Sequence, residues 1–180
     1  MYEVEMKVRA DHSAVREALA RRGADRIGTV TQRDTYYDAP TRDFAETDEA
    51  LRVRREEREG EGRAKLTYKG PLVGETGKTR EEHETELGDG DTMDSILDSL
   101  GFVPVETVEK ERERFSLGEH TVTLDGVVGL GEFVEVETEV PEGEVDAARE
   151  GVARTVESLG LDPSEEIRTS YLGLLLEGTR

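Results

Sequence analysis

The chain has 180 residues, with 43 Asp or Glu against 24 Lys or Arg, and its formal net charge is -19. This acidic excess argues against a general nucleic-acid binder, which needs a basic surface, and the absence of cysteine excludes disulfides and thiolate chemistry. Since there is neither an apolar run of membrane-spanning length nor a signal peptide, we expect a single cytoplasmic domain over residues 1–180 with no membrane partner. The carboxylate excess, together with five lysines against nineteen arginines, predicts a halophilic source.

Alternation of apolar and polar residues predicts eight strands, at 2–9, 29–38, 50–57, 63–69, 80–87, 105–115, 119–125 and 131–140. Helical spacing predicts helices at 12–22, 92–100 and 144–159, and a last helix that begins at Asp162-Pro163 and runs past Tyr171. This order predicts an α+β fold, in which an eight-stranded, mostly antiparallel closed β-barrel has helices packed outside.

The polar faces of these strands are mostly charged. Because side chains alternate with a period of two, each of the following sets shares one face: Glu3, Glu5 and Lys7; Arg52 and Arg54; Lys65, Thr67 and Lys69; Lys110, Arg112 and Arg114; and Glu135, Glu137 and Glu139. A solvent-exposed outer face of a sheet would explain the charged residues of any single strand. Three basic faces in so acidic a chain favour the inverted arrangement, with the charges lining the barrel.

A barrel lined with charges needs a charged ligand, because burying unpaired charge is costly. Basic side chains on three strands suit a polyanion such as a triphosphate. The acidic pairs Glu3/Glu5 and Glu135/Glu137 offer the hard oxygen ligands that Mg²⁺ or Mn²⁺ prefers. This division of labour is typical of phosphoryl and nucleotidyl transfer.

The sequence resembles the CYTH superfamily, also called triphosphate tunnel metalloenzymes. Residues 3–7 match its ExExK signature, and the match continues through 32–38, 51–54, 65–71, Arg80 with Glu82 and Glu84, 110–112, 125–137 and 170–171. The resemblance implies an eight-stranded tunnel that binds a triphosphate with a divalent metal. Residues 129–137 and the Lys-Gly-Pro at 69–71 are most similar to class IV adenylyl cyclases, and thiamine triphosphatases and inorganic triphosphatases are related.

Carried over residue by residue, the resemblance implies three sets of site residues. The metal ligands would be Glu3, Glu5, Glu135 and Glu137. The phosphate-binding residues would be Lys7, Arg52, Arg54, Lys65, Lys69, Arg80, Lys110 and Arg112. Of these, Glu5, Lys7, Glu135 and Glu137 are expected to act in catalysis.

Three functions stay open at this point. The first is a class IV-like adenylyl cyclase that converts ATP to cyclic AMP and pyrophosphate. The second is a triphosphatase acting on inorganic triphosphate, thiamine triphosphate or a nucleoside triphosphate, and the third is a polyanion-binding module without catalysis. The sequence also leaves open whether the protein forms a homodimer.

Tyr36, Tyr37 and Tyr171 lie in the matched motifs. Either Tyr36 or Tyr37 should face the barrel interior, and the favoured role for Tyr171 is packing.

Overall fold

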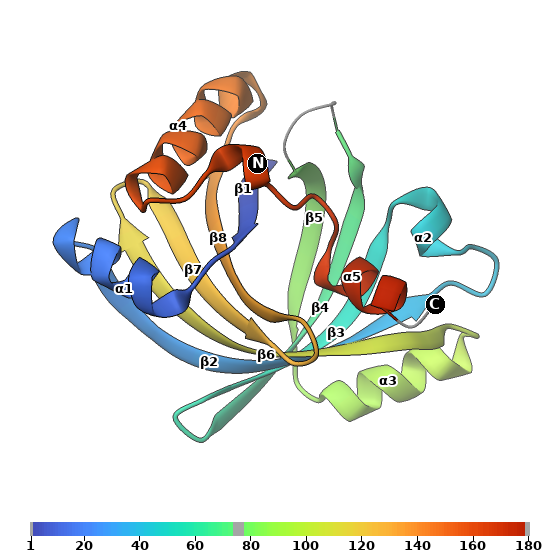
Figure 1. Ribbon diagram of the computed structural model, residues 1–180. Helices are drawn as coiled ribbons and strands as arrows, with labels where there is room; N and C mark the ends of the chain where they lie inside the picture. Colours follow the sequence, from blue (N-terminus) through green and yellow to red (C-terminus); the bar gives the residue numbers. More distant parts are fainter. Residues whose placement is uncertain (1, 74–77, 179–180) are drawn as a thin grey trace.

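The computed structural model describes residues 2–73 and 78–178, with Lys78 and Thr79 described by their backbone alone. Eight strands form a closed barrel in the order β1-β5-β4-β3-β2-β6-β7-β8, and all neighbours are antiparallel (Figure 1). The strands are β1 (Tyr2–Arg9), β2 (Asp25–Asp38), β3 (Ala50–Arg58), β4 (Glu61–Leu72), β5 (Lys78–Leu87), β6 (Val103–Leu117), β7 (His120–Val127) and β8 (Gly131–Val140). The predicted fold class is confirmed.

Three of the helices, α1, α3 and α4, cover the apolar outer face of the barrel, as Figure 1 shows. Helices α1 (His12–Arg21) and α4 (Val145–Ser158) pack on β1, β7 and β8, where Val15 and Val156 join a core with Val8 and Val134. Helix α3 (Gly90–Ser99) packs with Leu97 on a second core on β2 and β3. Helices α1 and α4 bury the apolar stripes that their helical spacing predicted, whereas α3 buries Leu97 but leaves Ile96 and Leu100 of its predicted stripe 45% and 63% exposed.

Barrel closure joins strands that are far apart in the sequence. β1 pairs with β8 along its whole length, from Tyr2 opposite Val140 to Arg9 opposite Phe133. On its other side β1 pairs with β5 at Glu3, Val4 and Glu5. Farther along β1, the backbone N–H of Ile167 donates to the carbonyl oxygen of Lys7 at 2.7 Å. The C-terminal segment therefore continues the hydrogen bonding of β1 beyond its pairing with β5.

Two helices differ from prediction. The short helix α2 (Phe44–Thr47), capped by Asp43, was not expected. The predicted last helix is wrong at its start: Asp162-Pro163 caps only a 3₁₀ turn, η2 (Pro163–Glu165), and α5 (Tyr171–Gly178) begins six residues after that turn. The segment between them is not helical, and the backbone N–H of its Ile167 donates to Lys7 of β1. A second 3₁₀ turn, η1 (Glu142–Glu144), precedes α4.

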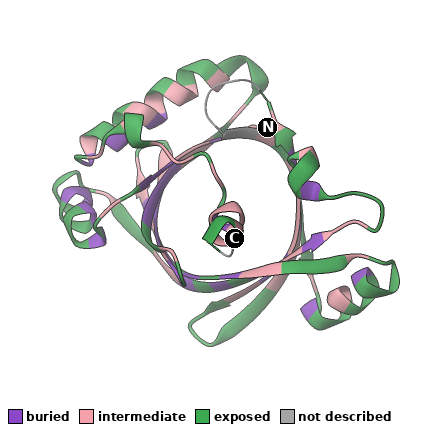
Figure 2. Ribbon diagram, turned by 45° about the vertical axis from the view of Figure 1, so that its right-hand side comes forward, coloured by how far each residue is buried: buried purple, intermediate pink, exposed green. Residues whose placement is uncertain are grey.

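Helix α5 lies across one end of the barrel. In Figure 2 it is seen within the ring of strands, and Tyr171 packs with Val108, Val127 and Phe133, which are buried on β6, β7 and β8. This end of the barrel is therefore partly closed by apolar side chains. Helix α2 lies on the opposite side of the same opening, just before β3 (Figure 1).

Among the described residues, no helix combines the length and the apolar character needed to cross a bilayer.

Candidate active site

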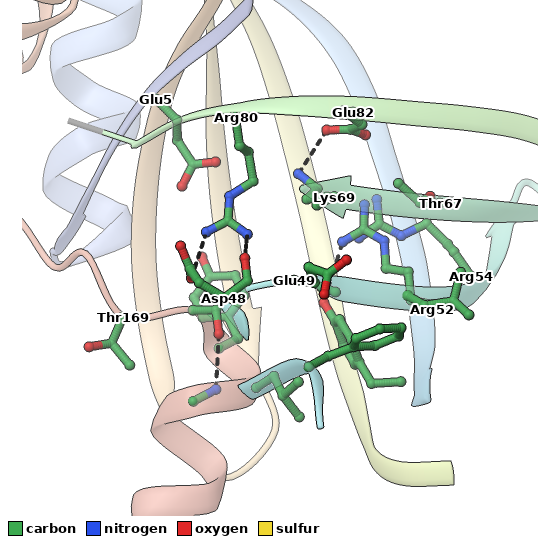
Figure 3. A pocket seen from close by; sticks show the side chains of 18 of the residues that line it. Glu5, Asp48, Glu49, Arg52, Arg54, Thr67, Lys69, Arg80, Glu82 and Thr169 are labelled. Atoms are coloured by element: carbon green, nitrogen blue, oxygen red, sulfur yellow. Dashed lines mark hydrogen bonds and ion pairs between the residues drawn. The ribbon is translucent and has the colours of Figure 1, made fainter. Parts of the chain in front are cut away.

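The barrel encloses a cavity of about 670 Å³ lined by charged side chains. Figure 3 shows several of them, from β3, β4 and β5, directed into the same space. All twelve predicted site residues line this cavity: Glu3, Glu5, Lys7, Arg52, Arg54, Lys65, Lys69, Arg80, Lys110, Arg112, Glu135 and Glu137. The inverted arrangement is thus present, with the apolar strand faces against the helices and the charged faces inside.

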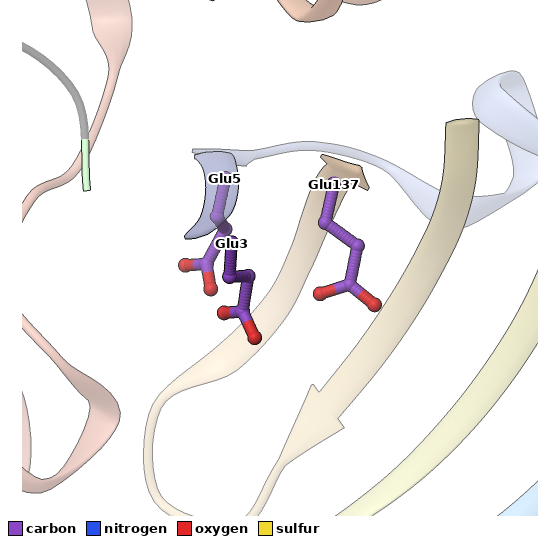
Figure 4. Close-up of side chains that lie close together, drawn as sticks. All are labelled: Glu3, Glu5 and Glu137. Carbon is purple, nitrogen blue, oxygen red and sulfur yellow. The ribbon is translucent and has the colours of Figure 1, made fainter. Parts of the chain in front are cut away.

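Three carboxylates meet on the wall formed by β1 and β8. One oxygen each of Glu3, Glu5 and Glu137 lie within 4.8 Å of one another, and Glu5 is directly opposite Glu137 in the strand register (Figure 4). Burial, with the charges of Glu5 and Glu137, raises the pKa of Glu3 to about 8 although Lys69 opposes the shift. Burial likewise raises the pKa of Glu137 to about 7. Such mutual repulsion is relieved when a cation binds between the carboxylates.

Glu135, the fourth predicted metal ligand, lies apart from this group. It is buried, and its Oε2 accepts a hydrogen bond from the Arg112 guanidinium at 2.9 Å. Arg112 also makes two hydrogen bonds to Asp125, at 2.8 and 2.6 Å. The structure therefore groups Glu3, Glu5 and Glu137 as metal-ligand candidates and pairs Glu135 with a predicted phosphate-binding residue.

Two buried aspartates, which the sequence reasoning did not single out as site residues, neutralise arginines of the cavity. Asp34 on β2 is fully buried and accepts two hydrogen bonds from Arg54, both at 2.7 Å. Burial alone would raise its pKa, but the charges of Arg52 and Arg54 hold the pKa of Asp34 well below its usual range. Asp125 on β7 likewise accepts two hydrogen bonds from one guanidinium, that of Arg112. Both pairs are two-pronged and hold the guanidinium groups in fixed orientations.

The two lysines of β4 among the predicted phosphate-binding residues also have acidic neighbours. Lys65 Nζ lies 2.8 Å from Glu84, and Lys69 Nζ lies 2.9 Å from Glu82 and 3.6 Å from Glu3. Although burial and Arg52 oppose it, the carboxylates of Glu3 and Glu82 raise the pKa of Lys69. In Figure 3 the Lys69–Glu82 contact is drawn as a dashed line. The cavity is therefore lined by both basic and acidic side chains, because these lysines are paired with glutamates.

Arg80 is held at the opening by the residue that follows α2. Its guanidinium lies 3.4 Å from the Asp48 carboxylate, whose other oxygen accepts the backbone N–H of Leu72 at 2.7 Å. Asp48 has a left-handed backbone (φ 56°), a conformation that Asp tolerates better than most residues. This one side chain links α2 to β4 and β5.

The CYTH domain family matches residues 1–171 of this sequence. The chain belongs to the CYTH family. A Methanocaldococcus jannaschii protein named "putative adenylate cyclase" is 38% identical over 176 residues, which cover 97% of this chain and 98% of that protein. A solved Pyrococcus horikoshii structure is 40% identical, has a TM-score of 0.91, and is matched over 98% of this chain and 99% of its own.

A more distant solved structure comes from Hippeastrum, and its description reads "putative adenylyl cyclase" with a dominant triphosphatase activity. It is 20% identical and has a TM-score of 0.70, with 98% of this chain and 95% of that chain covered. At this identity the likeness shows the shared fold alone. The barrel fold is thus shared with a protein that is described by a triphosphatase activity as well as by the name adenylyl cyclase.

The region matched by the CYTH family ends at Tyr171, the first residue of α5 and a further cavity residue. Its hydroxyl donates to Asp125 at 2.8 Å, and its ring centroid lies 4.2 Å from Lys7 Nζ and 5.0 Å from Lys110 Nζ. Burial and the charge of Arg112 lower the pKa of Lys110 to about 7. Tyr171 therefore contacts the basic side chains of Lys7 and Lys110, whereas the sequence indicated only a packing role for it.

Of the two neighbouring tyrosines, Tyr36 faces the cavity. The Arg52 guanidinium donates to its hydroxyl at 3.4 Å. The Tyr37 hydroxyl instead donates to Asp94 of α3 at 2.6 Å, on the outer face of the barrel. Strand alternation required that the two point to opposite faces, and the structure assigns which is which.

Proposed function

We propose that this CYTH protein is a metal-dependent adenylyl cyclase that converts ATP to cyclic AMP and pyrophosphate inside the barrel. The observation that carries the proposal is the carboxylate group of Glu3, Glu5 and Glu137 beside a wall of lysines and arginines in one cavity. The 38% identical M. jannaschii protein named "putative adenylate cyclase" supports this choice among reactions of triphosphates.

The donor set fits Mg²⁺ or Mn²⁺. Three carboxylates whose oxygens lie within 4.8 Å of one another offer the hard oxygen ligands that these ions prefer. The raised pKa values of Glu3 and Glu137 show that the three negative charges are costly to hold together without a cation. Metal bound there would neutralise phosphate charge and increase the electrophilicity of the α-phosphorus.

The charge balance of the cavity indicates that triphosphate and metal bind together. Carboxylates accompany Arg54, Lys65, Lys69 and Arg112, so the cavity offers little net positive charge to a bare polyanion. A triphosphate that arrives with a divalent cation brings fewer negative charges, and it adds the ligands that the cation needs beyond three carboxylates. We expect triphosphate affinity to fall sharply when the metal is chelated.

The basic residues of the chain would position the triphosphate and stabilise the leaving group. In the reaction, the ribose 3′-oxygen bonds to the α-phosphorus, its proton is released, and the bond from the α-phosphorus to the bridging oxygen breaks. Negative charge then develops on pyrophosphate. Arg52 and Lys69, whose charged forms are favoured in the cavity, would offset this charge from fixed positions.

The test is to identify the products formed from ATP and from inorganic triphosphate, with Mg²⁺ or Mn²⁺, in molar KCl. Cyclic AMP with equimolar pyrophosphate is the expected result, and Glu137→Gln should abolish it while Glu139→Gln, an exposed change on the same strand, should not. Orthophosphate without cyclic AMP would show that the protein is a triphosphatase rather than a cyclase. If the protein binds triphosphate but converts neither substrate, it is a binding module without catalysis.

A further inference from the structure

The last helix brings one aromatic ring into contact with two basic residues of the cavity. Tyr171 is the first residue of α5 and is buried, and Figure 2 shows α5 within the ring of strands. Lys7 Nζ of β1 lies over the tyrosine ring, 4.2 Å from its centroid, and Lys110 Nζ of β6 lies over the same ring at 5.0 Å. Both lysines are buried as well. Because β1 and β6 are not neighbours in the barrel, two separate parts of the basic wall meet at this ring.

The position of the ring is set by contacts that the fold itself makes. The Tyr171 hydroxyl donates to Asp125 of β7 at 2.8 Å. The ring packs edge-on against Phe133 of β8, with 5.0 Å between the centroids and 64° between the planes. Four residues earlier, the backbone N–H of Ile167 donates to the carbonyl oxygen of Lys7 at 2.7 Å. The C-terminal segment therefore contacts Lys7 through its backbone as well as through the tyrosine ring.

An aromatic ring attracts an ammonium group without cancelling its charge. The face of the ring carries partial negative charge and attracts a cation within about 6 Å of the centroid, yet the ring has no net charge. Lys69 and Arg112 instead have carboxylates within ion-pair distance, at 2.9 and 2.6 Å. Among the residues that the structure describes, Lys110 forms no ion pair, and the ring is its close partner. Its positive charge therefore remains available to a phosphate.

The surroundings of Lys110 otherwise disfavour its charged form. Burial and the charge of Arg112 lower the pKa of Lys110 to about 7. The charged or titratable groups around it are Arg112, Asp125, Arg54 and Asp34, together with Lys7 and Tyr171 at the shared ring. A lysine that must be protonated to bind a phosphate binds it less tightly when its charged form is costly. The attraction of the ring for a cation acts in the opposite direction.

We propose that Tyr171 is a positioning residue of the triphosphate site, whose ring holds the ammonium groups of Lys7 and Lys110 in place for the phosphates. The proposal rests on the proposed function in one respect, that the basic residues of the cavity bind a triphosphate. It adds that the last helix is part of this site, since its first residue positions lysines from two distant strands. Side chains that are held in place before binding lose less entropy when the ligand arrives.

The experiment changes the charge distribution of the ring while its size stays nearly the same. Tyr171→Phe is the reference protein, and the test protein has 3,4,5-trifluorophenylalanine at the same position, because fluorine withdraws electrons from the face of the ring. Inorganic triphosphate with Mg²⁺ is titrated into both by calorimetry. At pH 7.5 we expect the fluorinated protein to bind about fivefold more weakly. The difference should be smaller at pH 6, where Lys110 is mostly charged beside either ring.

Two controls separate this effect from a general loosening of α5. Leu175 packs in the apolar cluster with Tyr171 and does not line the cavity. Leu175→Ala should therefore weaken the packing of the helix and leave the triphosphate affinity within about twofold of the parent. In a Lys110→Met background, fluorination of the ring should weaken binding less than it does beside Lys110, because one of the two ammonium groups is gone.

Equal triphosphate affinities of the Tyr171→Phe and fluorinated proteins would overturn the proposal, and so would a fluorination effect that is the same with and without Lys110. If Leu175→Ala weakens binding as much as fluorination does, docking of the helix rather than the ring would be responsible, and the proposal would fail. In each of these cases the unaltered protein still binds triphosphate, and the proposed function stands. If the unaltered protein does not bind inorganic triphosphate, the proposed function and the positioning role fail together.

Discussion

Replacing Glu137 by Gln should stabilise the metal-free protein while removing its response to metal. Glu137 has a pKa of about 7 in the folded protein against 4.5 for an ordinary glutamate. Because each pKa unit corresponds to about 1.4 kcal/mol, the ionised carboxylate costs the folded state as much as about 3 kcal/mol at pH 8. Glutamine has a similar shape but no charge to bury, so Glu137→Gln should recover part of that free energy.

The sign of the pH dependence follows from the raised pKa. A carboxyl whose pKa is higher in the folded than in the unfolded protein favours the folded state below pH 4.5 and loses that advantage as the pH rises through about 7. The metal-free protein should therefore become less stable between pH 5 and pH 8. Glu137→Gln should reduce this loss, and at pH 4 the two proteins should unfold at similar temperatures.

Thermal unfolding at several pH values, in EDTA and in excess Mg²⁺, measures both effects. A gain of the full amount of about 3 kcal/mol would correspond to roughly 6–12 °C in Tm for a chain of this size, and a partial gain to proportionally less. Saturating metal at about 100 times its Kd should add about 3 kcal/mol to the unaltered protein and little to Glu137→Gln. Glu139→Gln is the control for removing an exposed charge from β8. A Glu137→Gln protein that is less stable than the parent in EDTA at pH 8 would refute the reasoning.

Three further predictions concern buried contacts of the cavity. Tyr171→Phe should lower the free energy of unfolding by about 1.5–3 kcal/mol in urea, because the hydroxyl donates to the charged Asp125; an unchanged midpoint would contradict this. Asp34→Asn should cost about 3–5 kcal/mol at pH 7, because it leaves Arg54 without its buried counter-charge, and the difference from the parent should shrink as acid protonates Asp34. Lys110→Arg should strengthen the binding of inorganic triphosphate relative to the parent more at pH 9 than at pH 7, because Lys110, with its pKa near 7, must take up a proton whereas arginine stays charged; calorimetric titration of both proteins at each pH measures this ratio, and a ratio that does not change with pH would contradict it.

The barrel and its charged interior could be predicted because both depend on local alternation. Glu135 and Glu137, or Lys65 and Lys69, must share a face whatever strands lie beside them. The expected range 131–140 coincides with β8, and the expected 2–9 with β1. The sets of like charge also indicated which face was inside, since a solvated sheet gives no reason to separate basic strands from acidic ones.

The ion pairs of the cavity could not be predicted because they depend on which strands become neighbours. Asp34 meets Arg54 because β2 pairs with β3 in one particular register, and Asp125 meets Arg112 across β6 and β7. Alternation fixes the face of a residue but not its partner on the next strand. The register also places Glu135 opposite Lys7 rather than opposite Glu5, and its carboxylate accepts from Arg112 of β6.

The start of the last helix was mispredicted because a local helix-start motif competes with a contact to a strand that is distant in the sequence. Asp162-Pro163 is a good start for a helix, and Asp162 does cap η2. The helix does not continue, because Ile167 donates its backbone N–H to Lys7, some 160 residues earlier in the chain. The Ile167 N–H is then not available to a carbonyl four residues earlier, as a helix would require, and this contact with β1 outweighs the preference for a longer helix.

The pairing of β1 with β8 has a consequence for the order in which the protein folds. Strands β2 to β5 can pair with their sequence neighbours as they leave the ribosome, but Glu5 reaches its place opposite Glu137 only after residue 137 has been synthesised. Until then β1 has no partner on that side, and Ile167 is not yet available to bond to Lys7. The carboxylates of Glu3, Glu5 and Glu137 therefore come together late, and the gain of metal affinity during refolding would report closure of the barrel.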